Sequence, residues 1–206
     1  MRKSSILLIF IILVFRLDGQ VINNINLFSG ISFSKITWNT NGLTLYERPI
    51  IGYSTGLKIG YLEHNYWTCN TKIRFYQLGG SDKVTLVDAN GNNIEDITTR
   101  FYFNELGINA TIQVKYPINK FIPFIYLGPR LDFLLSSSQS FKDIEKNNYG
   151  LDFGIGLSYH LTDKVFLTSD IGYSLLIRKI VNKTNCTLNP DINMLIEVGI
   201  GCNFLK

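Results

Sequence analysis

Ionisable side chains recur at alternate positions in several stretches of this 206-residue chain, and they are the first candidates for chemistry. Buried carboxylates and bases can relay protons or ions, or they can pair with one another in a structural network. Six basic groups face five acidic ones, so each charge has potential partners and a structural network is favoured over an ion path. The candidates are Lys58, Lys72, Arg74, Glu105, Lys115, Arg130, Asp132, Asp152, Asp170, Arg178 and Glu197.

Metal or cofactor binding is not indicated by the remaining reactive residues. Cys69, Cys186 and Cys202 are odd in number, and their spacing matches no zinc site. We expect Cys186 in a loop and the other two cysteines on strands. The segment 79–98 is rich in Asp, Asn and Glu but lacks the acidic spacing of an EF-hand, so we interpret it as a solvated hairpin tip. The sequence therefore predicts no catalytic, metal-binding or cofactor-binding residues.

The first residues have the pattern of an export signal. Arg2 and Lys3 precede an unbroken apolar run over 6–15, and Gly19 provides a small residue at the expected cleavage point. The alternative is a membrane anchor, but the run is shorter than the roughly 18 residues that mark a spanning helix. We predict a signal peptide over 1–19 and one domain over 20–206. The remaining charge, about +2, is too small and scattered to indicate nucleic-acid binding.

Alternation of apolar and polar residues with a period of two is the dominant pattern of the chain. Between 149 and 160, for example, Leu151, Phe153 and Ile155 fall on one face, while glycine, serine and Asp152 fall on the other. No stretch shows a sustained helical period. The predicted strands cover 24–34, 51–61, 66–78, 101–116, 121–135, 149–160, 165–178 and 194–204.

The connections between these strands alternate between long and short. The long ones cover 35–49, 79–98, 136–148 and 179–192, and the short ones cover 62–65, 117–120 and 162–164. This order is typical of an outer-membrane barrel whose two termini lie on the periplasmic side.

The chemistry of the two faces favours a membrane barrel over a soluble, lipocalin-like one. The polar face is rich in glycine, which suits a crowded lumen better than a solvated outer surface. Tyr149 and Tyr159 bracket an apolar stripe of roughly 33 Å along the strand. At a tilt of about 45° this stripe matches an apolar band of roughly 25 Å with aromatic girdles, and Tyr53 and Tyr61 repeat the placement. The predicted fold is all-β, an eight-stranded antiparallel up-and-down transmembrane β-barrel of the outer membrane.

Three segments resemble a known family. They are the runs Phe103–Ile108, Val114–Tyr116 and Phe121–Pro129, and they are similar to the middle of the PorT-like outer-membrane β-barrels of Bacteroidota. The resemblance implies the same barrel over the mature chain. The chain departs from the family pattern at Leu106–Gly107, where an Ile-Pro is usual. It also departs at its end, because members usually end on an aromatic residue and here Leu205 and Lys206 follow Phe204. A few members serve secretion and gliding, an activity that the resemblance does not assign to this chain.

An enzyme of the outer leaflet would need a base and a nucleophile near the long connections. His64 and His160 are the only histidines, and both are predicted at the opposite, short-turn end. Asp152 and Asp170 are not a convincing hydrolytic pair. We predict a non-enzymatic barrel that is structural or displays its long loops to a protein partner, in contact with outer-membrane lipid. A lipid-modifying enzyme and a soluble ligand-binding barrel are the alternatives.

Overall fold

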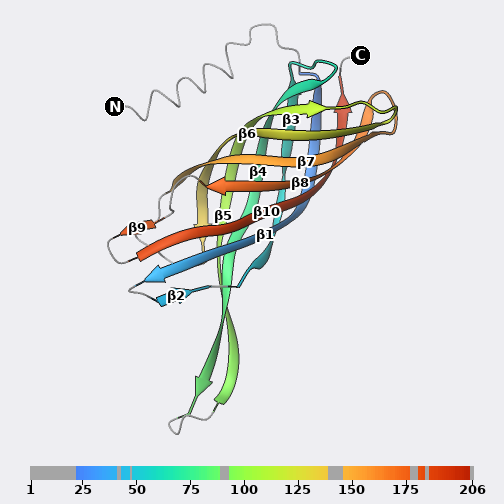
Figure 1. Cartoon of the computed structure of the whole chain (residues 1–206). Helices are drawn as coiled ribbons and strands as arrows, with labels where there is room; N and C mark the ends of the chain where they lie inside the picture. Colours follow the sequence, from blue (N-terminus) through green and yellow to red (C-terminus); the bar gives the residue numbers. More distant parts are fainter. Residues whose placement is uncertain are drawn as a thin grey trace, which may run out of the picture.

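The computed structural model describes residues 22–40, 43–46, 48–88, 93–138, 146–176, 181–183 and 186–204. Eight long strands of this described part form one closed antiparallel ring, in which each strand pairs with the next and β1 pairs with β10 (Figure 1). They are β1 (Asn24–Thr40), β3 (Ile50–Tyr61), β4 (Trp67–Val87), β5 (Asn93–Lys115), β6 (Phe121–Ser137), β7 (Asn147–His160), β8 (Val165–Leu176) and β10 (Cys186–Asn203). Two short strands, β2 (Leu43–Leu45) and β9 (Val181–Lys183), pair with the ends of β1 and β10. The predicted eight-stranded up-and-down barrel is confirmed.

The alternation of the sequence determines which face of each strand points outward. On β7, Leu151, Phe153, Ile155 and Leu157 are exposed on the outer surface, while Asp152 between them is buried. Exposed aliphatic and aromatic residues recur in this way on all eight strands of the ring. A continuous apolar outer surface is what a barrel presents to lipid. Within the described residues, no helix is long and apolar enough to cross a membrane.

The three short turns lie at one end of the barrel. Leu62 and Asn119 within them adopt positive φ values of 53° and 55°, the left-handed conformation that tight turns often require. The first and last barrel strands also meet at this end, where Asn24 pairs with Asn203 (Figure 1). The end with the short turns is therefore the periplasmic one.

The β4–β5 hairpin corrects one prediction. Residues 79–98, predicted as a loop, continue the ladder from Gly79↔Tyr102 as far as Val87↔Asn93, so the hairpin projects well beyond the barrel (Figure 1). The pair Gly79-Gly80 suggested a turn but lies inside the strand. A side chain there would collide with the backbone oxygen of Phe101 or of Ile36, so these glycines permit close backbone approach.

The closing strand corrects a second prediction. β10 begins at Cys186, not at 194, so Cys186 lies on a strand and the second half of the predicted loop 179–192 belongs to the ladder with β1. The sequence did not predict this part of the strand, because proline, here Pro190, cannot donate a ladder hydrogen bond and is rare inside strands. The ladder accommodates it with a β-bulge, since Lys35 pairs with Ile192 and Ile36 pairs with Pro190. The loop predicted over 35–49 is likewise shortened, because β1 continues to Thr40.

An apolar cluster fills the inside of the barrel at the base of the projecting hairpin. Its buried members are Ile36, Tyr76, Leu78, Phe101 and Phe103. The rings of Phe101 and Phe103 pack edge to face with centroids 4.5 Å apart, a favourable arrangement for aromatic pairs. This cluster lies on the extracellular side of the polar lumen.

Candidate functional site

The candidate site is the polar lumen, because nine of the eleven charged residues proposed from the sequence are buried there. They occupy inward positions on seven strands, which is a direct result of the period-two alternation. The nine are Lys58, Lys72, Arg74, Glu105, Arg130, Asp132, Asp152, Asp170 and Glu197.

Glu197 of β10 is the centre of one half of this network. It forms ion pairs with Lys72 and Arg74. Its Oε1 lies 2.9 Å from Nε of Arg74. Ser54 Oγ also donates to Oε1 of Glu197 at 2.5 Å. Lys72 lies in addition 3.6 Å from Oδ1 of Asp170. Lys72 of β4 thus reaches both β8 and β10 across the lumen.

Asp152 of β7 is the centre of the other half. Its carboxylate lies 2.9 Å from Nη1 of Arg130 and 3.2 Å from Nη1 of Arg74. Ser174 Oγ and Asn109 Nδ2 also donate to it, at 2.6 and 2.5 Å. A buried carboxylate with two cations and two neutral donors is well compensated for its loss of hydration.

Arg130 and Tyr76 extend the network toward the apolar cluster. Nε of Arg130 lies 2.7 Å from Oδ2 of Asp132, and the guanidinium carbon lies 5.7 Å from the ring centroid of Tyr76. The hydroxyl of Tyr76 donates to Oε2 of Glu105 at 2.8 Å. Glu105 is therefore held by a tyrosine and not by direct contact with an arginine.

Three of the predicted residues stand apart. Lys58 is buried with its ammonium 5.1 Å from the ring centroid of Phe124, and no ion pair is found for it among the described residues. Lys115 lies at the periplasmic rim, where its Nζ is 2.5 Å from Oε1 of Glu63. Arg178 lies outside the described residues.

The histidines do not contribute to the network. His64 stacks on Trp67 and His160 stacks on Phe166, with centroids 5.9 and 5.6 Å apart, and both lie at the short-turn end. No group of three His, Cys, Asp or Glu side chains in the described part of the chain is arranged to hold a metal ion.

Sequence reasoning missed the neutral members of the network. Tyr76, Asn109, Ser54 and Ser174 each bind a carboxylate. The period-two pattern could have identified them, because each occupies an inward-facing position of its strand. They carry no charge, so the pattern of charged residues does not identify them.

The closed ring, the apolar outer belt and the packed polar interior together define an outer-membrane β-barrel. This class is also the one that the sequence predicted, with the outer membrane as its location. No protein-family profile matches the chain, and no curated protein matches it by sequence.

Solved structures with a similar fold are outer-membrane proteins. OprG from Pseudomonas aeruginosa is 13% identical, with 90% of this chain and 97% of that chain covered, at a TM-score of 0.56. Neisserial surface protein A is 15% identical, with 90% and 99% covered, at a TM-score of 0.50. The outer-membrane protease OmpT from Escherichia coli is 8% identical, with 90% and 98% covered, at 0.49. Identities of this size show a common fold alone.

Proposed function

We propose that the protein is a non-enzymatic barrel that serves as a rigid base for the β4–β5 hairpin and presents this hairpin to a protein partner outside the cell. The observation that carries the proposal is the continuity of the hairpin with the barrel wall. The paired strands run without interruption from Trp67↔Val114 at the periplasmic rim to Leu86↔Glu95 near the tip. The apolar cluster packs at the base of the projecting part, so the hairpin is anchored where it leaves the barrel.

The interior supports a role in display over a role in transport. The lumen holds nine buried charged side chains, and the apolar cluster lies between them and the extracellular end. Side chains fill the bore of an eight-stranded barrel as a rule. A bore filled by side chains gives the barrel rigidity, as a base for a projecting hairpin requires.

The surface of the projecting hairpin supports a protein as the partner. Val84, Leu86, Ile94 and Ile97 are all exposed there, and Ile94 keeps 66% of its surface accessible. An ion pair between Lys83 and Asp96 lies beside them. Clustered exposed aliphatic residues with charges beside them are typical of protein interaction surfaces.

Site-specific photo-crosslinking on intact cells tests this proposal. A photoreactive residue at Ile97 should give a discrete crosslinked protein, while the same residue at Ile155, in the lipid-facing belt, should give none. The folded state of both variants is checked by heat-modifiable gel migration. Absence of a discrete product at Ile97, or the same product at both positions, would contradict the proposal.

A lipid-modifying enzyme is the second candidate that the sequence analysis left open, and lipid analysis of a deletion strain separates it from display. An altered acyl or headgroup composition, restored by the wild-type gene, would favour the enzyme. A soluble barrel is the third candidate, and the apolar outer belt argues against it, because a soluble barrel would expose this surface to water.

We also propose that the chain is a PorT-like barrel with a cleaved signal peptide over 1–19. The resembling segments lie on β5 and β6 or directly after β5. Glu105 of β5 is buried there and accepts a hydrogen bond from Tyr76. Homologues that keep the barrel but lack an acidic residue at the position of Glu105 and prolines at those of Pro123 and Pro129 would argue against membership.

A further inference from the structure

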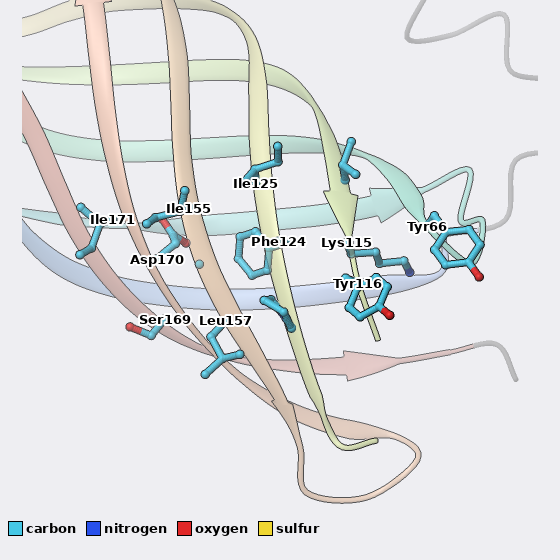
Figure 2. A pocket seen from close by; sticks show the side chains of 13 residues that line it. Tyr66, Lys115, Tyr116, Phe124, Ile125, Ile155, Leu157, Ser169, Asp170 and Ile171 are labelled. Carbon is cyan, nitrogen blue, oxygen red and sulfur yellow. The ribbon is translucent and has the colours of Figure 1, made fainter. Parts of the chain in front are cut away.

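A groove of about 730 Å³ lies on the outer wall of the barrel, across β5, β6, β7 and β8 (Figure 2). Its sides are outward-facing apolar residues, among them Ile125, Ile155 and Leu157. Because it is part of the lipid-facing belt, the medium that fills it is the membrane and not water.

The register of the strands explains why the wall is hollowed there. Ile125, Ile155 and Ile171 are paired across three strands and form a high ridge. The next row toward the periplasm consists of Pro123, Leu157 and Ser169. Proline and serine are small beside isoleucine, so this row is lower than the ridge and leaves space for a ligand.

Ser169 is unusual among the lipid-facing hydroxyl residues. Ser29 donates to the backbone oxygen of Ser54 at 3.3 Å, and Thr55 donates to that of Phe28 at 3.1 Å. Thr71 likewise binds the hydroxyl of Tyr61 at 3.2 Å. Ser169 has no hydrogen bond within the described residues, although it faces the apolar belt. A hydroxyl in hydrocarbon without a partner is unfavourable, so an acceptor from the membrane is expected at this point.

Two tyrosines mark the periplasmic end of the same groove. Tyr66 from the β3–β4 turn and Tyr116 from the end of β5 lie beside each other there (Figure 2). They are 58% and 64% exposed. Tyrosine at the boundary between hydrocarbon and water keeps its ring in the apolar layer and its hydroxyl among the polar headgroups.

We propose that this groove is a binding site for one phospholipid of the periplasmic leaflet. One acyl chain lies along the isoleucine ridge, and an ester carbonyl of the lipid accepts a hydrogen bond from Ser169. Tyr66 and Tyr116 border the lipid on the other side of the groove, where Tyr116 lies three strands from Ser169 (Figure 2). The leaflet follows from the position of the groove, which lies on the side of the short turns.

Native mass spectrometry of the full barrel tests the site. The protein is reconstituted in nanodiscs of phosphatidylethanolamine and phosphatidylglycerol at three to one, and the phospholipids that remain bound after release are counted. The wild type should retain one phospholipid. Ser169→Leu, which fills the low row, should reduce this adduct at least tenfold, and Ser169→Ala, which removes only the hydroxyl, about fivefold.

Ser29→Ala is the matched control, since it removes a lipid-facing hydroxyl outside the groove, and it should leave the adduct unchanged. Leucine suits a lipid-facing position, so Ser169→Leu should fold, and its heat-modifiable migration verifies this. An equal adduct in the wild type and Ser169→Leu would overturn the proposal. A wild-type barrel that retains no phospholipid would also overturn it. So would a dimer in which this wall binds a second barrel and not a phospholipid.

Discussion

Nη1 of Arg130 lies 2.9 Å from Oδ1 of Asp152, and this ion pair connects the neighbouring strands β6 and β7 inside the barrel. Both side chains are almost entirely buried. Neither group could be left alone there at low cost, because a buried charge without a partner is strongly unfavourable. The pair therefore contributes to holding two strands in one register as well as to filling the lumen.

Arg130→Ala should lower the stability of the barrel by about 3–5 kcal/mol, because it leaves Asp152 and Asp132 short of a cation. Lys115→Ala is the matched control, since Lys115 pairs with the half-exposed Glu63 at the rim and should cost at most about 1 kcal/mol. The measurement is the temperature at which the folded band disappears in heat-modifiable gels. A larger loss for Lys115→Ala than for Arg130→Ala would contradict the assigned network.

Ile155→Arg should destabilise the barrel by about 2–4 kcal/mol if the residue lies near the middle of the bilayer. Ile155 is 61% exposed on the outer wall, so arginine there would face hydrocarbon. Urea titration in lipid vesicles measures the change, with Ile155→Leu as the control that keeps the site apolar. Equal midpoints for the two variants would show that residue 155 does not face the hydrocarbon.

The projecting hairpin should lose order in acid. Hydrogen bonds from Lys83 and Thr85 lower the pKa of Asp96 below its ordinary value of 3.8. A carboxyl whose pKa is lowered by folding stabilises the folded form above its ordinary pKa, and this contribution is lost as the pH falls through the lowered one. Amide protection over 82–99, taken relative to the intrinsic exchange rate at each pH, should therefore fall below about pH 3.8, and Asp96→Asn should remove this pH dependence. A loss of protection of the same size in Asp96→Asn would show that another group is responsible.

Mass spectrometry of the N-terminal peptide of the protein from outer membranes should show a chain that begins at Gln20, as glutamine or as its pyroglutamate form. The expectation rests on the short apolar run over 6–15 and on Gly19, which is small enough for a signal peptidase. Gly19→Arg should block cleavage and leave a heavier form. A mature protein that begins at Met1 would mean that the run is retained.

The sequence predicted the facing of the strands better than their length. Alternation identifies Asp152 as inward and Ile155 as outward. A slip of one residue would put the apolar face inside and the charges in lipid, so the facing of each strand is strongly specified. It failed at Gly79-Gly80 and at Pro190, where residues typical of turns lie inside long ladders. Their role depends on the strand beside them, which local sequence does not identify.

The partners within the lumen could be predicted only in part. Arg130 and Asp132 are two residues apart on one strand, so their contact follows from the sequence alone. Contacts such as Arg74 with Glu197 join β4 to β10, and they depend on the tilt and stagger with which the sheet closes. Those quantities are properties of the whole ring.

The direct pairing of Asn24 with Asn203 places the beginning of the first strand and the end of the last side by side. The order of strands around the ring is consequently independent of where the chain starts. A short linker between these two ends, combined with a cut in the turn at Asn119, should produce a circularly permuted barrel with the same strand neighbours. In such a chain the pairing of β10 with β1 would become an ordinary hairpin. β6 and β5 would become the first and last strands, and their pairing would close the ring.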